Sequence, residues 1–153
     1  MQAFRIADRR FSIFDGTGAR IVGGRWNSPG RPVIYAAETF AGAILEVLVH
    51  SNLGRVPKTH ALVEITIPDG VSTEVVSLDT VAGWDAEDQI VSRVYGDQWL
   101  EELRTAVLLT PSLVTRGRER NVLLNPEHPE FGRITASKAE DVVWDERLFR
   151  GMR

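Results

Sequence analysis

The chain has 153 residues, of which 43% are hydrophobic and 25% are charged, and its formal net charge is −3. This length and composition predict one globular domain, residues 1–153, and the acidic balance gives no electrostatic attraction toward nucleic acid. The lack of cysteine excludes disulfides and cysteine metal sites, and no run approaches the ~18 apolar residues that a membrane helix needs. We therefore expect a cytoplasmic protein that binds neither membranes nor nucleic acid directly.

The first part of the chain predicts a strand, a loop and a second strand. Ala3–Ala7 alternates loosely between apolar and polar residues, as a half-buried strand does. Asp15–Gly18 is a turn signal, and its G-x-G pattern lacks the third glycine of a dinucleotide fingerprint. Turn residues are dense around Arg25, and the β-branched run Pro32–Ala36 predicts a short buried strand that ends at Tyr35.

The helix that is expected next carries an acidic residue of interest. After Thr39, one buried helix face is predicted by apolar residues at i, i+3, i+4, i+7 and i+8, namely Phe40, Ala43, Ile44, Val47 and Leu48. At ~100° per residue, Glu46 lies off this stripe, one turn after Gly42 and one turn before His50. Two interpretations stay open: a solvated Glu46 with Gly42 in a helix–helix contact, or open space at Gly42 beside a carboxylate that faces a cleft. Gly54 is a candidate C-cap.

The middle of the chain predicts extended segments and then a helix. His60–Ile67 alternates strictly, which is typical of a strand, and Val71–Leu78 predicts a further extended piece. A helix is expected over Asp88–Leu103, with an interruption near Gly96 and with Asp97 as the cap of its second part.

Short strands are predicted in the last third of the chain. The expected segments are Ala106–Leu109, Asn121–Leu124, Arg133–Thr135 and Val142–Trp144. Strands come first in the chain, then one early helix, then more strands with short helices. This order favours an α+β fold with mixed or antiparallel central sheets and a few short helices over a doubly wound α/β fold.

The common metal and hydrolase signatures are absent from the sequence. No metal site is expected, because no H-x-x-x-H or similar spacing joins His50, His60 and His128. Ser112 lacks the G-x-S-x-G context of a hydrolase nucleophile. A glycosidase would need a second carboxylate near Glu46, and the candidates are Glu38, Glu64 and Glu127. The residues alone therefore indicate a cleft for an anionic ligand and no more.

Five segments, taken in order, resemble the RES domain, a family named for an arginine, a glutamate and a serine. Those three residues match Arg25, Glu46 and Ser112. The similarity extends from Phe4 to Phe149, which is nearly the whole chain. The segments are Gly24–Asn27, Val33–Glu38, Leu45–His50, Pro111–Ser112 and Asn121–Phe131.

The resemblance implies a toxin of a bacterial type II toxin–antitoxin pair, with the fold of the ADP-ribosyltransferase toxins. Such a protein would take NAD⁺ as its substrate, without a bound cofactor, and would break the nicotinamide–ribose bond. The ADP-ribose would pass to water, to inorganic phosphate or to a target protein. NAD⁺ depletion would arrest growth until an antitoxin with a helix-turn-helix DNA-binding region plugs the cleft.

The resemblance also implies roles for the site residues. Because nicotinamide leaves as a neutral group, one carboxylate, that of Glu46, is enough to stabilise the oxocarbenium-like transition state. Arg25 is expected to bind the pyrophosphate, and Tyr35 to stack on the nicotinamide ring. Ser112 is expected to hydrogen-bond the nicotinamide amide or to position its neighbours. Arg5 would add a second phosphate contact.

Further residues and alternatives complete the expectation. Asn27 and His50 are additional candidates at the site, and Glu38 is expected to be structural. The tryptophans Trp26, Trp99 and Trp144 are expected in the core or at an interface. Two other activities stay open: a toxin that transfers ADP-ribose to a cellular protein, and a toxin that acts by binding without turnover.

Overall fold

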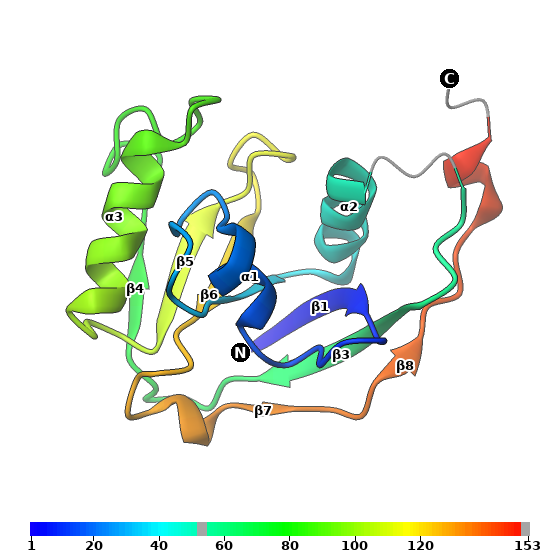
Figure 1. Cartoon of the computed structure of the whole chain (residues 1–153), viewed down its shortest axis with the longest axis horizontal. Coiled ribbons are helices and arrows are strands. Elements are labelled where there is room, and N and C mark those ends of the chain that lie inside the picture. Colours follow the sequence, from blue (N-terminus) through cyan, green and yellow to red (C-terminus); the bar gives the residue numbers. More distant parts are fainter. Residues whose placement is uncertain (52–54, 151–153) are drawn as a thin grey trace.

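The computed structural model describes residues 1–51 and 55–150, and its strands form one curled sheet (Figure 1). The strands are β1 (Gln2–Asp8), β2 (Ile34–Ala37), β3 (His60–Thr66), β4 (Thr73–Val75), β5 (Val107–Pro111), β6 (Arg120–Leu124), β7 (Thr135–Ala136) and β8 (Glu140–Asp141). The helices are α1 (Thr17–Val22), α2 (Phe40–Ser51) and α3 (Ile90–Glu101), with the 3₁₀ turns η1 (Phe131–Arg133) and η2 (Glu146–Phe149).

The sheet is mixed, which confirms the predicted α+β class. Its order is β4-β5-β6-β2-β1-β3-β7, and β8 also pairs with β3. Strands β4 and β5 are parallel, and every other pairing is antiparallel. Strands and helices are interleaved without the regular βαβ alternation that a doubly wound fold requires.

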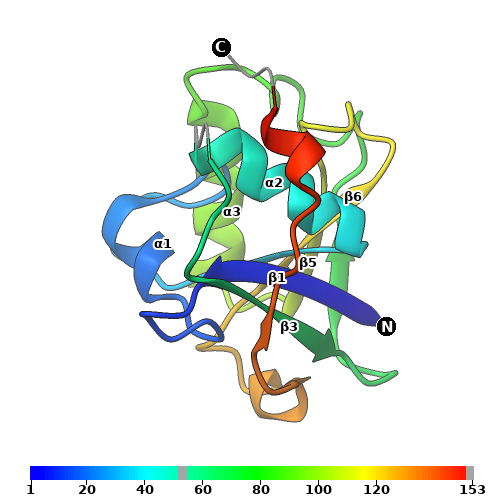
Figure 2. The ribbon, with the colours of Figure 1, turned by 90° about the vertical axis from the view of Figure 1, so that its right-hand side faces the viewer.

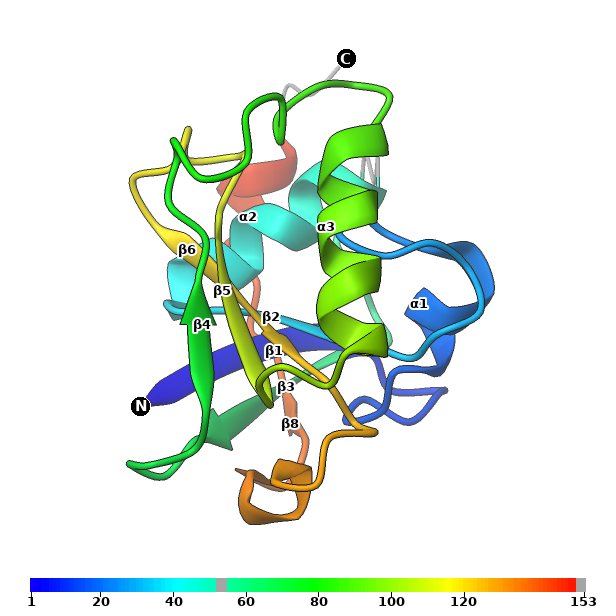
Figure 3. The same cartoon turned by 90° about the vertical axis from the view of Figure 1, so that its left-hand side faces the viewer.

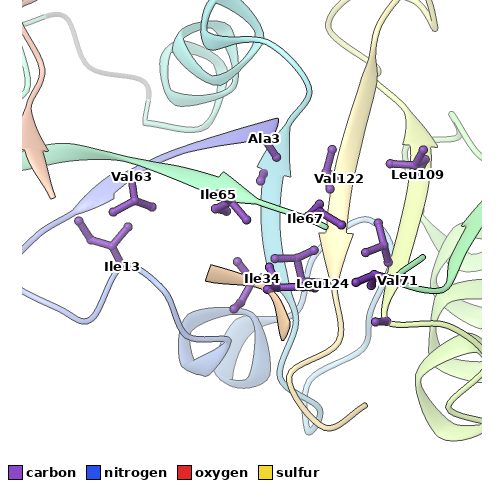
Figure 4. Close-up of a cluster of buried hydrophobic side chains, with 14 of the residues drawn as sticks. Ala3, Ile13, Ile34, Val63, Ile65, Ile67, Val71, Leu109, Val122 and Leu124 are labelled. Atoms are coloured by element: carbon purple, nitrogen blue, oxygen red, sulfur yellow. The ribbon is translucent and has the colours of Figure 1, made fainter. Parts of the chain in front are cut away.

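One face of the sheet carries a continuous hydrophobic core, because alternate residues of neighbouring strands point to the same side. Figure 4 shows this cluster, which includes Ala3, Ile34, Val63, Ile65, Leu109, Val122 and Leu124. Residues from the connecting loops close its ends, among them Ile13, Ile67 and Val71. This core is the rigid support beneath the opposite face.

The opposite face is divided between two helices. Helix α3 lies against β5 (Figure 3) and packs Trp99 and Leu100 with Trp26 and Leu123. Helix α2 crosses over β1 (Figure 2) and packs Ala43 and Val47 against that strand, together with Ile6 and Trp144. The expected burial of three tryptophans is confirmed, since Trp26, Trp99 and Trp144 are at most 8% exposed.

The sheet opens between β1 and β2. These strands pair only through Phe4 and Ala37, whereas β1 pairs with β3 along its full length. Beyond this single pair the residues of β1 and β2 diverge, so a wedge forms at the centre of the sheet between the two helices. The wedge is the geometric origin of the cleft described below.

Helix α3 corrects one sequence prediction. It runs without interruption from Ile90 to Glu101, and Asp97 lies inside it rather than capping a second part. Gly96 is buried against the loop that contains Trp26, where an added Cβ would overlap the Trp26 carbonyl oxygen. The glycine therefore marks a close approach of two backbones, which sequence alone cannot distinguish from a helix break.

Other boundaries also differ from the predictions. The expected turn at Asp15–Gly18 runs into helix α1, which at six residues is too short to show a periodic pattern. The strand expected at Val142–Trp144 lies just earlier, at Glu140–Asp141, and Arg133 belongs to η1. Only the centre of Val71–Leu78 pairs, as β4. Gly54, the candidate C-cap, lies outside the described residues.

Candidate active site

A cleft of about 740 Å³ occupies the wedge between β1 and β2. Arg25 and Glu46, far apart in the sequence, both line it, as do Arg5, Tyr35 and Asn121. Its walls come from the α1–β2 loop and α3 on one side and from α2 on the other. The two side chains at the centre of the hypothesis therefore share one cavity.

Glu46 is held by a network of side chains from three elements. Its Oε1 accepts a hydrogen bond from Asn121 Nδ2 at 3.2 Å and a longer one from the Ser112 hydroxyl at 3.4 Å. Its Oε2 lies 3.3 Å from His50 Nε2, one helical turn on. Asn121 lies just before the apolar residues of β6, and Ser112 directly follows β5. The ends of these two adjacent strands thus orient the Glu46 carboxylate, which projects from α2.

This network keeps Glu46 ionised. Partial burial raises the pKa of Glu46, but hydrogen bonds from His50, Asn121 and Ser112 outweigh it and leave the pKa below its ordinary value. In return, the hydrogen bond to Glu46 raises the pKa of His50. The cleft therefore presents a fixed negative charge at neutral pH.

Arg25 lies on a loop that is held in place by hydrogen bonds from side chains of α3. Its Nη1 donates to the carbonyls of Trp84 and Ala86 at 3.1 and 2.9 Å, and its own carbonyl accepts from the Ser92 hydroxyl at 2.6 Å. Arg93 Nε donates to the neighbouring Gly24 carbonyl at 2.8 Å. A guanidinium has five N–H groups, so Nε and Nη2 of Arg25 keep donors for a ligand in the cleft.

The same loop receives two further contacts from inside the protein. Asp97 of α3 accepts a hydrogen bond from the Ser28 amide at 2.8 Å. The Tyr35 hydroxyl donates to Asn27 Oδ1 at 2.7 Å and accepts from the Trp26 amide at 3.1 Å. Burial raises the pKa of Tyr35 far above its ordinary value, so the hydroxyl stays protonated. Its ring lines the cleft, while its hydroxyl supports the loop.

Asn27 does not line the cleft. Its side chain is fully buried, and its amide nitrogen donates to the carbonyls of Ala19, Ser28 and Arg31. The structure therefore places this candidate beneath the loop, as a support for Tyr35 and not as a ligand contact.

Arg5 lies at the floor of the cleft, on β1. Its Nε donates to the Ile13 carbonyl and its Nη1 to the Tyr35 carbonyl, both at 2.7 Å. Burial lowers the pKa of Arg5, although a guanidinium stays protonated at any physiological pH. The cation therefore joins β1 to β2 just where their pairing ends, and its remaining N–H groups are available to an anion.

Of the two interpretations of Gly42 that the sequence left open, the structure favours a packing contact, although with a strand and not with another helix. A Cβ at this position would lie 3.0 Å from Thr39 Oγ1 and 3.3 Å from the Ala37 Cβ. The glycine lets α2 approach β2 closely, so its role is a helix–strand contact rather than room for a ligand. Glu38, expected to be structural, pairs with Arg120 on the neighbouring strand.

Among the residues of the cleft that sequence reasoning did not assign to the site are Asn121 and Arg93. Asn121 was noted only as part of a family segment, although a polar residue next to a buried apolar run can indicate a functional position. Its partner across the sheet is Ala37. Arg93 lines the cleft from α3, and no motif or spacing in the sequence marks it. Within the described ranges, no three acidic, histidine or cysteine side chains gather as metal ligands. None of the described helices could cross a membrane.

Comparison with known proteins identifies the family. The RES domain model matches residues 2–145. The chain is 45% identical over 139 residues to the Prs ADP-ribosylating toxin of Sphingobium sp. strain YBL2, covering 88% of this chain and 86% of that protein. It is 37% identical over 142 residues to Toxin Res of Pseudomonas putida KT2440, covering 91% of this chain and 94% of that protein.

A solved structure has the same fold. The Mycobacterium tuberculosis MbcT–MbcA toxin–antitoxin complex contains a chain that superposes with a TM-score of 0.77 at 18% identity, over 92% of this chain and 83% of that one. At this identity the likeness concerns the fold. The family match and the two relatives go further, and on that basis this protein belongs to the RES-domain family of toxins.

Proposed function

We propose that this toxin consumes NAD⁺ by cleaving its nicotinamide–ribose bond and passing the ADP-ribose to water or phosphate. The observation that supports the proposal best is the meeting of the Glu46 carboxylate and the Arg25 guanidinium in one cleft. The substrate carries a pyridinium cation at one end and a diphosphate at its centre. A fixed anion and a fixed cation facing one cavity suit these two charges.

In the proposed reaction, Glu46 stabilises the positive charge that develops on the ribose as the bond breaks. The bonding electron pair leaves with nicotinamide, which becomes neutral and needs no proton from the enzyme. Asn121 and Ser112 hold the carboxylate in place, so its reorganisation cost is low. Electrostatic stabilisation of this kind acts most strongly where water is excluded.

Arg25 and Arg5 are the proposed diphosphate contacts. Both line the cleft, and in both the hydrogen bonds to backbone carbonyls fix the guanidinium while other N–H groups have no partner within residues 1–51 and 55–150. Guanidinium groups bind phosphate oxygens bidentately, which suits a diphosphate. The Tyr35 ring is the proposed stacking surface for nicotinamide.

The central test is the rate of nicotinamide release by the Glu46→Gln variant. Glutamine keeps the shape and the hydrogen-bonding oxygen but removes the charge, so we expect a loss of at least ~100-fold. Glu64→Gln, at an exposed carboxylate on β3 outside the cleft, is the matched control and should retain the wild-type rate. Equal rates for wild type and Glu46→Gln would show that Glu46 does not have this role.

Protein mono-ADP-ribosylation is a second candidate, because the Sphingobium relative is named an ADP-ribosylating toxin. The same cleft would cleave NAD⁺, and a nucleophile of a target protein would take the ADP-ribose. Incubating the protein with labelled NAD⁺ and a bacterial extract separates the two candidates. Label on one protein, appearing as fast as nicotinamide, favours transfer, whereas free ADP-ribose or its phosphate favours consumption of NAD⁺.

An antitoxin is the proposed partner, since the structural neighbour was solved as a toxin–antitoxin complex. Apolar side chains border the cleft, and two of them, Val22 and Val49, are more than 60% exposed. Such a rim suits a partner segment that enters the cleft. We propose that this partner carries a helix-turn-helix DNA-binding region, and co-purification with the product of a neighbouring reading frame would test it.

A further inference from the structure

A second pocket, of about 510 Å³, lies beside the cleft and is rich in positive charge. We define the basic pocket by its lining residues: Asp8, Arg10, Arg55, Val56, Pro57, Lys58, Thr59 and His60. Three cations and one carboxylate leave two positive charges in excess when His60 is counted as neutral. This excess stands out in a chain whose formal net charge is −3.

The cations of the basic pocket are not neutralised equally. Arg10 forms a bidentate ion pair with Asp8, in which Arg10 Nη2 and Asp8 Oδ2 are 2.6 Å apart. Neither Arg55 nor Lys58 makes a side-chain hydrogen bond or ion pair with any described residue. Two exposed cations at one pocket, without a compensating anion among those residues, favour an anionic ligand.

His60 joins the basic pocket to the cleft. Its side chain lines both cavities, because it begins β3 opposite Asp8, at the end of the sheet wedge. Its Nδ1 is buried and has no hydrogen-bond partner among the described residues. An unsatisfied buried polar atom is unfavourable, so a ligand that engages the His60 ring would offset part of that cost.

We propose that the basic pocket binds a phosphate group next to the NAD⁺ cleft. A phosphate carries a charge of about −1.5 to −2 near neutral pH, which matches the local excess. The group could come from two sources: inorganic phosphate, or the 2′-phosphate of NADP⁺. This inference rests on the proposed function only in taking the neighbouring cleft to hold the dinucleotide.

Calorimetric titration of the full chain with inorganic phosphate, at constant ionic strength, tests the pocket directly. The R55Q/K58Q double variant removes the two unpaired cations, and we expect its phosphate affinity to fall about tenfold or more. R118Q/K138Q removes two exposed cations that line neither cavity, so it makes the same change in net charge and should bind as wild type. In the wild type, the His60 imidazole resonances should shift with phosphate saturation.

Two probes that lack nicotinamide, ADP-ribose and ADP-ribose 2′-phosphate, separate the two sources. If the pocket takes the 2′-phosphate, the wild type should prefer the phosphorylated probe about tenfold, R55Q/K58Q should lose that preference, and inorganic phosphate should compete with it. If the pocket takes free phosphate, inorganic phosphate and ADP-ribose should bind together without such a preference.

The proposal is overturned if R55Q/K58Q binds inorganic phosphate and ADP-ribose 2′-phosphate as tightly as the wild type does. It is also overturned if R118Q/K138Q loses affinity to the same extent, because the effect would then be one of net charge. None of these binding measurements requires turnover. Nicotinamide release from NAD⁺ in phosphate-free buffer reports the proposed function separately, so either proposal can fail alone.

Discussion

Arg25 and Glu46 face one cleft from walls of different construction. The loop of Arg25 is tied to α3 mainly through its backbone: the carbonyls of Gly24 and Arg25 and the amide of Ser28 all bond to side chains of α3. Glu46 projects from α2 and is held by side chains alone. We call the loop of Arg25 together with α3 the arginine wall, and this wall is built into the core of the protein. The glutamate wall is Glu46 on α2 with the side chains that bond to it, and it is a local network.

This difference separates stability from activity. A change in the arginine wall should disturb the packing beneath the loop and lower both the stability of the fold and the rate of reaction. A change in the glutamate network should lower the rate while the fold remains intact. Substitutions in the two walls therefore test whether they differ in this way.

The largest effect is expected at Gly96, where α3 meets the loop. Gly96→Ala would push a methyl group into the Trp26 carbonyl, so the helix or the loop must move. We expect the free energy of unfolding to fall by about 3 kcal/mol and nicotinamide release to fall with it. Chemical denaturation measures the first quantity. Gly132→Ala, where an added Cβ meets nothing within 4 Å, is the control and should change neither.

The glutamate network gives the next largest effect. Asn121→Ala removes a donor to an ionised carboxylate, a contact that contributes about 1.5 kcal/mol or more, so we expect nicotinamide release about tenfold slower. The melting temperature should change little by comparison with Gly96→Ala. If Asn121→Ala instead unfolded the protein without a specific loss of rate, the two walls would not differ as described.

Asn121→Ala should also move the acid limb of the pH–rate profile. In the wild type the network lowers the pKa of Glu46, so the rate should hold until the pH falls below the ordinary range of glutamate. Without Asn121 that pKa rises, and the rate should begin to fall at a higher pH. The depressed pKa also contributes stability that is present above the unfolded pKa and is lost as the pH falls through the folded one.

The same contrast explains what the sequence could and could not predict. Strands with strict alternation, such as β3, and the amphipathic face of α2 follow from periodicity, and the order of elements was enough for the α+β class. Gly96 was misread and Gly42 was left open, because in one dimension a glycine at a close packing contact looks like a helix break or an open space. Only the fold reveals that Gly96 meets the Trp26 backbone and that Gly42 meets the side chains of Thr39 and Ala37.

The residues of the site also fall into those that could be predicted from the sequence and those that only the fold brings together. The roles of Arg25, Glu46 and Ser112 were predicted through the family resemblance, and the residues alone indicated only a cleft for an anionic ligand. Asn121 reaches Glu46 because β6 lies beside β5 and β2, a neighbourhood set by sheet order rather than by any local pattern. Asn27 was a candidate through the resemblance alone, and no sequence pattern shows that its amide donates to the carbonyls of Ala19, Ser28 and Arg31.

The smallest effect is expected at His50, the exposed member of the glutamate network. Its side chain is 79% exposed, so its pairing with Glu46 is screened by solvent and contributes at most about 1 kcal/mol. The raised pKa of His50 means that this contribution is present below the unfolded pKa and is lost as the pH rises through the folded one. His50→Gln should therefore slow nicotinamide release about twofold near pH 6 and not measurably near pH 9. A large loss at both pH values would mean that His50 contacts the substrate itself, and the glutamate wall would then extend further along α2 than its hydrogen bonds indicate.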